Sequence, residues 1–84
     1  MKLIYIEWMD AVANPNWFEK DMAEHWMDES KMIIKQAGWL IKETKEYICL
    51  AGAYKVEDEN TSEQYNLLQK IPKPWILKRK VIKL

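Results

Sequence analysis

Apolar side chains change their spacing near Met32, and this change restricts the fold more than any other feature of the chain. Phe18, Met22 and Trp26 are spaced four residues apart, which predicts one amphipathic helix of about ten residues. From Met32 onward the apolar residues follow a two-residue period on both parities, which predicts a long strand with both faces partly covered. The chain therefore joins a single short helix to a set of strands.

The segment before the helix has the composition of a strand. Residues 3–9, LIYIEWM, are dense in β-branched and aromatic side chains, and Asp10 ends the run. An Asn-Pro-Asn turn follows at residues 14–16, and the helix is predicted to begin at a capping box opened by Asn16 or by Asp21. We expect the helix to cover one open end of the folded strands with its apolar stripe.

Three further strands follow the long one. Polar residues 42–46 predict a hairpin connection, and residues 57–63, EDENTSE, predict an exposed and mobile acidic loop. Gly38 and Gly52 lie where a strand can bend sharply. The remaining segments are strands at residues 47–56, 64–71 and 75–84, with a stiff Pro-Lys-Pro turn at residues 72–74.

The predicted order of one strand, one helix and four strands is a mainly β fold. Five short antiparallel strands with two glycine bends fit a small bent barrel better than an open sheet, because closure removes edges that a small domain cannot cover. The 84 residues form one domain, residues 1–84, with a thin core. Association with further copies of the chain would enlarge that core.

Charge is balanced overall but unevenly distributed. The chain holds 13 basic and 13 acidic residues, and all the acids lie in residues 1–63 together with seven lysines. Residues 64–84 hold six basic residues and no acid. Such a segment pairs with an acidic surface of its own kind or with an external polyanion. The ordinary interpretation is a solvated edge strand whose lysines prevent unwanted pairing.

The sequence also predicts the compartment. No apolar run is long enough to cross a bilayer or to form the core of a signal peptide, so we expect a cytoplasmic protein without a membrane partner. Cys49 is the only cysteine, which agrees with a reducing compartment.

Residues that could carry catalysis are few. His25 lies among Asp21, Asp28 and Glu29, but one imidazole on an acidic helix is usually a solvated face and not a metal site. Cys49 between two apolar neighbours is most simply a small buried hydrophobic residue. The two glycines form no phosphate-binding loop. We therefore expect no enzymatic activity, no metal and no cofactor.

Several segments resemble the Sm-like proteins, an RNA-associated family of five-stranded bent barrels that assemble into rings. Residues 3–10 resemble the family's first strand, and Gly38-Trp39-Leu40 resembles the glycine, any residue, leucine signature of its second. Residues 47–51 follow at about the distance of the third strand, and residues 67–76 resemble the second motif. The resemblance covers residues 1–10 and 32–84, and it extends to small Sm-like proteins of phage and environmental origin. It implies a small Sm-like (SH3-like) barrel.

The departures from the family pattern concern the helix and three polar positions. The family's helix usually precedes the first strand, whereas the predicted helix follows it. Thr44 stands where the family has an aspartate, an apolar residue near Tyr47 replaces an asparagine, and a Pro-Lys-Pro turn replaces an arginine and a glycine. In the family these polar residues bind a uridine base.

The resemblance also implies a binding site. In Sm-like rings the loops between strands two and three and between strands four and five face the central opening, where aromatic rings stack on bases and cations contact phosphates. Carried over by position, the nucleic-acid-binding residues are Lys45, Tyr47, Lys70, Lys73 and Trp75. The alternative is that Tyr47 and Trp75 pack in the core or between subunits and that the lysines only aid solubility.

Three functions follow as hypotheses. The leading one is a non-enzymatic Sm-like protein that forms a homo-oligomeric ring and binds single-stranded RNA. The alternative is a phage-type protein-interaction module that binds a host protein through the acidic helix and loop. The third is a barrel that binds a small molecule between Trp39 and Trp75.

Overall fold

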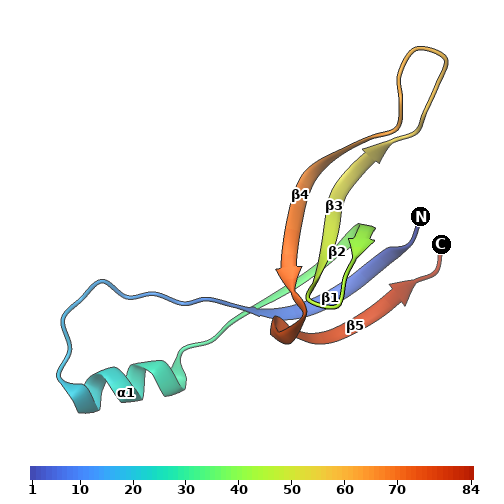
Figure 1. Ribbon diagram of the computed structural model, residues 1–84. Helices are drawn as coiled ribbons and strands as arrows, with labels where there is room; N and C mark the ends of the chain where they lie inside the picture. The colour runs from blue at the N-terminus through green and yellow to red at the C-terminus, as the bar shows by residue number, and fades with distance from the viewer.

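One antiparallel sheet and one α-helix make up the computed structural model, which describes residues 1–84 (Figure 1). The five strands lie in the order β4-β3-β2-β1-β5. The predictions of a mainly β fold and of a single helix between the first two strands are therefore confirmed. The elements are β1 (Leu3–Asp10), α1 (Lys20–Glu29), β2 (Met32–Glu43), β3 (Tyr47–Lys55), β4 (Gln64–Pro72), the 3₁₀ turn η1 (Lys73–Trp75) and β5 (Ile76–Ile82).

The sheet bends so strongly that strands which are not neighbours touch through their side chains. Gln36 Nε2 of β2 donates to Gln69 Oε1 of β4 at 2.6 Å, and Gln36 Oε1 in turn accepts from Trp8 Nε1 of the neighbouring β1 at 2.7 Å. Arg79 of β5 likewise donates two hydrogen bonds to Glu43 of β2, although β1 lies between these strands in the sheet. The backbone ladders nevertheless end at β4 and β5, so closure into a barrel is not detected and both strands are open edges.

The core occupies the concave face of this bent sheet. Eight of the 84 residues are buried, which is a small core even for a short chain. Gly38 of β2 packs closely there, because a Cβ atom at this position would lie 3.1 Å from the Cβ of Leu50. The buried cluster consists of Ile4, Ile6, Trp8, Ile48, Leu50 and Ile71, and Ile34, Leu40 and Ile76 pack against it.

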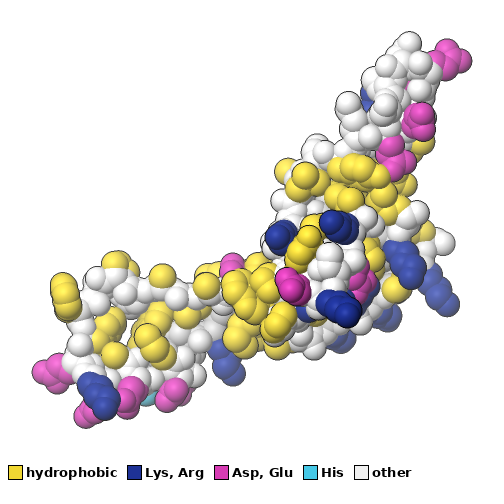
Figure 2. Space-filling view, in the orientation of Figure 1, with side chains coloured by type: hydrophobic (Ala, Val, Ile, Leu, Met, Phe, Trp, Pro, Cys, Tyr) yellow, Lys and Arg dark blue, Asp and Glu magenta, His cyan; other side chains and the backbone are white.

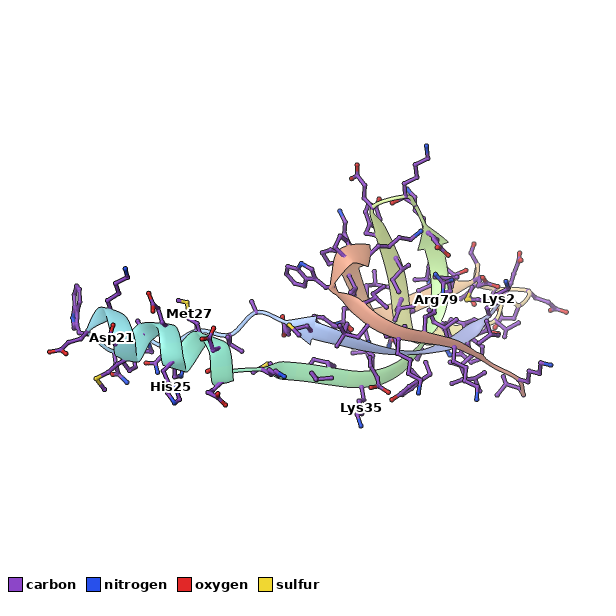
Figure 3. All side chains as sticks on the ribbon, turned by 90° about the horizontal axis from the view of Figure 1, so that it is seen from below. Lys2, Asp21, His25, Met27, Lys35 and Arg79 are labelled. Atoms are coloured by element: carbon purple, nitrogen blue, oxygen red, sulfur yellow. The ribbon has the colours of Figure 1, made fainter.

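The helix does not cover the end of the folded strands, so that expectation is wrong. α1 projects beyond the paired ends of β1 and β2, away from both chain termini, and none of its residues is buried (Figures 1 and 3). The β1–β2 ladder extends to the pair Asp10 and Met32, and only Ser30 and Lys31 separate α1 from β2. This short connection holds the helix past the end of the ladder.

The resulting molecule is elongated. Its principal extents are 62 × 24 × 23 Å, and its radius of gyration is 17.5 Å. A compact domain of this length has a radius of gyration of about 12 Å. The chain as a single copy therefore leaves a large fraction of its surface without internal packing.

Element boundaries differ from the predicted ones in small ways. The helix begins at Lys20 after Glu19, so neither Asn16 nor Asp21 caps it, and no side chain bonds to its free N–H groups. The irregularity in β2 lies at Ile41 and not at Gly38. A Cβ atom at Gly52 would lie 2.9 Å from the side chain of Leu67, and the backbone of Leu67 has a left-handed φ of 54°. The β2–β3 connection is shorter than predicted because β2 continues to Glu43.

The acidic loop between β3 and β4 is exposed, as predicted, but it has an internal structure. Asp58 Oδ1 accepts hydrogen bonds from the backbone N–H of Asn60 and from the backbone N–H and hydroxyl of Thr61. These bonds lower the pKa of Asp58, the bond from Asn60 most. The loop is thus a defined turn at the tip of a long hairpin.

Candidate functional site

The two loops implicated by the sequence lie against each other. The backbone N–H of Lys73, in the turn after β4, donates to the carbonyl of Glu46, in the β2–β3 turn, at 2.8 Å. Thr44 organises the β2–β3 turn, because its hydroxyl accepts from the N–H groups of Glu46 and Tyr47, both at 3.1 Å. The pairing of β3 with β4 and the Lys73–Glu46 bond therefore bring residues 44–47 and 70–73 together at one end of these two strands.

Tyr47 and Lys70 form a pair on this surface. Lys70 Nζ lies 4.1 Å from the centre of the Tyr47 ring, a cation–π contact between β3 and β4. Lys70 is exposed and makes no ion pair, so its charge is free to meet an anion. Lys45 is exposed in the β2–β3 turn and also has no acidic partner. An aromatic ring beside an unpaired ammonium group can stack on a base while the ammonium contacts a phosphate.

Lys73 and Trp75 lie in different surroundings. Lys73 Nζ contacts Glu43 Oε2 at 2.7 Å, so this charge is already paired. Trp75 stacks on Trp8, with ring centroids 6.4 Å apart and an interplanar angle of 15°. The structure thus groups Tyr47 with Lys70, while Lys73 belongs to an ion-pair cluster and Trp75 to an aromatic pair. The assignment of a binding role to all five residues stays a prediction.

Sequence reasoning missed the ion-pair cluster at Glu43. Arg79 Nη1 and Nη2 bond to its two carboxylate oxygens at 2.9 and 2.8 Å, in addition to the contact with Lys73. The Arg79 guanidinium, followed by the Lys73 ammonium, lowers the pKa of Glu43 to about 2. No local signal identifies this partner, because Glu43 and Arg79 are 36 residues apart.

A basic hollow was only partly foreseen. The sequence indicated a basic C-terminal segment, and the β1–β5 ladder places Tyr5 opposite Lys80 and Glu7 opposite Lys78. Tyr5 donates to Glu7 Oε2 at 2.6 Å, which raises the pKa of Tyr5. We call this surface the basic hollow; it is lined by Tyr5, Lys78, Lys80, Val81, Ile82 and Lys83.

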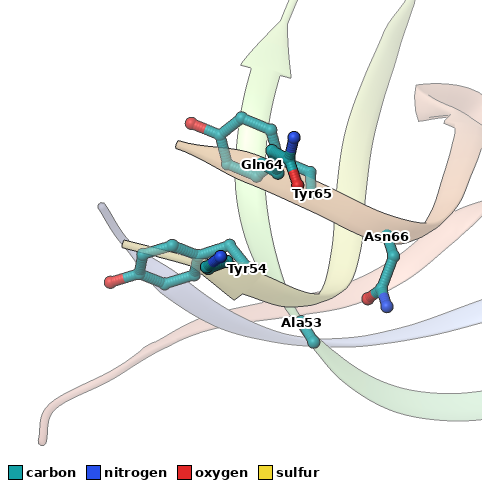
Figure 4. A pocket seen from close by; sticks show the side chains of 6 residues that line it. Ala53, Tyr54, Gln64, Tyr65 and Asn66 are labelled. Atoms are coloured by element: carbon teal, nitrogen blue, oxygen red, sulfur yellow. The ribbon is translucent and has the colours of Figure 1, made fainter. Parts of the chain in front are cut away.

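A second hollow lies on the distal part of the β3–β4 hairpin, where both strands meet the acidic loop. Tyr54 and Tyr65 stand opposite each other on neighbouring strands, with ring centroids 6.2 Å apart (Figure 4). Trp39 meets Tyr54 edge to face, with centroids 4.9 Å apart. Trp39 therefore packs apart from Trp75, and the small-molecule site expected between these two tryptophans is not formed.

Features of the helix and the cysteine also differ from expectation. Cys49 is half-buried rather than buried. Trp17, just before the helix, is fully exposed at 101%. No group of three or more His, Cys, Asp or Glu side chains is arranged to hold a metal ion. One side of α1 forms a shallow helix groove lined by Phe18, Asp21, Met22, His25, Trp26 and Glu29.

Comparison with known proteins found no relative of this chain. Protein-family models, curated proteins and solved structures gave no match to this chain. The single α-helix is too short and too polar to span a bilayer.

Proposed function

We propose that the chain is a non-enzymatic Sm-like protein that assembles with copies of itself into a ring and binds single-stranded RNA. The observation that carries the proposal is the Tyr47 and Lys70 pair, which lies where the β2–β3 and β4–β5 connections meet. These are the two connections from which Sm-like rings contact RNA. The bent five-stranded sheet supports the same interpretation.

Self-assembly is supported by the two open edges. β4 exposes Leu67 and Leu68, at 75% and 68%, and β5 exposes Leu77 and Val81. An edge strand with exposed apolar side chains is a template for pairing with another chain. Pairing β4 of one copy with β5 of the next is a head-to-tail contact, and such contacts close into a ring when the rotation allows.

The ligand proposal depends on the distribution of free charge. Lys45 and Lys70 are exposed cations without acidic partners, and the Tyr47 ring lies beside the Lys70 ammonium. Stacking of a base on an aromatic side chain contributes about 1–3 kcal/mol, and each phosphate contact makes binding sensitive to salt. A flexible single strand can present both groups to this surface.

The test is binding of fluorescent uridine-rich and adenine-rich RNA oligonucleotides, measured by anisotropy at several salt concentrations. We expect Tyr47→Ala to weaken binding roughly 5- to 150-fold through lost stacking. Lys70→Ala should weaken binding and reduce the salt slope by about one. Tyr65→Ala and Lys55→Ala are matched controls on the distal hairpin and should have little effect.

Two results would remove parts of the proposal. Binding that is undetectable or independent of salt would exclude RNA as the ligand. Light scattering after nuclease treatment tests assembly separately, since a ring has a multiple of the 10.1 kDa chain mass. A mass of one chain at all concentrations would exclude the ring.

A second function is favoured by α1, which has no packing partner within its own chain. In that case the chain binds a different protein through the acidic helix and the acidic loop. Replacing Glu57, Asp58 and Glu59 with neutral residues should then weaken partner binding, while RNA affinity is absent in the parent chain.

A further inference from the structure

The helix α1 lacks most of the features that stabilise a helix. It has ten residues, no buried side chain and no side-chain N-cap. Its last turn holds Asp28 and Glu29 and no basic residue, which is unfavourable next to the negative end of the helix dipole. Helices shorter than about 12 residues are marginal in water without tertiary contacts. The helix therefore needs a surface that supplies apolar contact and positive charge.

The helix groove shows what that surface must be. Phe18, Met22 and Trp26 form its apolar floor, and Asp21 and Glu29 stand at its rim. α1 as a whole holds four acidic residues and one lysine. A suitable partner surface presents apolar side chains surrounded by cations, and its acidic residues do not outnumber its basic ones.

The same chain carries such a surface in the basic hollow. Tyr5 and Ile82 provide its apolar part, and Lys78, Lys80 and Lys83 surround them. Among the residues that line it none is acidic, and Glu7 beside it is bonded to Tyr5. The space-filling view shows acidic side chains on the helix and towards the hairpin tip, and most basic side chains on the sheet, where a few acidic ones lie among them (Figure 2).

Within one copy these two surfaces are separated. Ile82 and Lys83 lie next to the C-terminus, whereas α1 projects at the other end of the 62 Å long molecule (Figure 1). Ser30 is extended, so the chain continues away from the helix directly into β2. Pairing of α1 with α1 of another copy would bring two acidic helices together, which is electrostatically unfavourable.

We infer that α1 of one copy docks in the basic hollow of a second copy. Phe18, Met22 and Trp26 then cover Tyr5 and Ile82, and the hollow's lysines face the acidic rim and the acidic last turn of the helix. This contact uses a face of β5, whereas ring formation uses its backbone edge. The inference requires self-association but neither RNA binding nor pairing between β4 and β5.

Charge exchange between full-length variants tests this contact. The helix variant carries Asp21→Lys and Glu29→Lys, and the hollow variant carries Lys78→Glu and Lys80→Glu. In each variant alone, the helix and the hollow carry charge of the same sign, so copies of that variant repel each other at this contact. In a mixture, the helix of each variant meets a hollow of opposite charge on the other variant. The readout is hydrogen exchange of the α1 amides at low and high protein concentration. Glu57→Lys with Glu59→Lys is a control for charge that leaves both surfaces intact.

In the parent chain and the control, we expect protection of α1 to rise roughly in proportion to protein concentration. Each charge variant alone should lose that rise while the sheet amides stay protected, and mixing the two should restore it. Three results would overturn the inference: no protection of α1 at any concentration, protection independent of concentration, or no recovery in the mixture. Ring assembly is judged separately by molar mass, so failure of one proposal does not imply failure of the other.

Discussion

At the scale of single residues, Glu43 connects parts of the chain that are distant in sequence. It binds Arg79 of β5 and Lys73 of η1, and thereby ties the end of β2 to the C-terminal segment across the intervening strand. Its low pKa means that the native chain holds this carboxylate ionised down to about pH 2. The ion pairs therefore join β2 to β5, two strands that the backbone ladder does not pair.

This carboxylate gives a pH-dependent contribution to stability with a definite sign. The pKa of Glu43 is about 2 when folded and near its ordinary value of 4.5 when unfolded, so its contribution is complete above pH 4.5 and is lost as the pH falls toward 2. We expect Glu43→Gln to lower the free energy of unfolding at neutral pH. The free energy of unfolding of this variant should also fall less steeply than that of the parent chain between pH 4.5 and about pH 2. Urea unfolding across a pH series measures both effects.

The control for this experiment is Glu57→Gln. Glu57 is an exposed carboxylate of the acidic loop and forms no ion pair. This variant should leave the pH dependence of the parent chain unchanged. An identical pH slope for Glu43→Gln and the parent would contradict the role given to Glu43.

At the scale of elements, α1 and the sheet behave as separate units. No residue of the helix is buried, whereas the strands share one continuous core. Stability changes in parts of a chain that do not touch add independently and can leave the rest unaffected. A local change in α1 should therefore appear in the helix and not in the unfolding of the sheet.

The N-cap position tests this separation. Glu19 occupies the N-cap without a side-chain bond, and Glu19→Ser supplies a hydroxyl that can accept from a free N–H. We expect the helix to gain about 1 kcal/mol, which corresponds to about fivefold slower exchange of its amides. The urea midpoint of the sheet, followed by the fluorescence of buried Trp8 with the other tryptophans replaced, should not change.

Glu63→Ser changes an acidic residue to serine at a site outside any helix, and it should not alter exchange in α1. If Glu19→Ser instead raised the urea midpoint of the sheet, the helix and the sheet would be coupled within one chain.

At the scale of the whole molecule, the small core and the open edges dominate. Eight buried residues support an elongated chain with apolar side chains exposed on both edge strands and on the helix. A chain with this surface is expected to gain stability from its own copies, because association removes apolar area from water.

We therefore expect the apparent unfolding temperature to rise with protein concentration. The corresponding gain in the free energy of unfolding is up to about 1.4 kcal/mol for each tenfold increase in concentration. Differential scanning calorimetry over a dilution series measures the shift. Leu68→Lys places a charge on the β4 edge and should abolish the part of the shift that arises from edge pairing. An unfolding temperature that is constant on dilution of the parent chain would argue against self-association.

The residue patterns specified the local structure of this protein. Dense β-branched and aromatic residues defined β1, the two-residue period after Met32 defined β2, and the Pro-Lys-Pro turn separated β4 from β5. These features depend on neighbouring residues, which fix the backbone conformation and the side-chain period, so they can be read directly along the chain.

Tertiary structure decided what depends on distance in space. The periodicity of α1 showed an apolar stripe but not what covers it, and the short connection to β2 sets its place beyond the sheet. The pairs of Glu43 with Arg79 and of Tyr47 with Lys70 join residues on different strands, brought together only by register and bending. A sequence determines which side chains share a strand face, but the curvature of the sheet determines which strands meet.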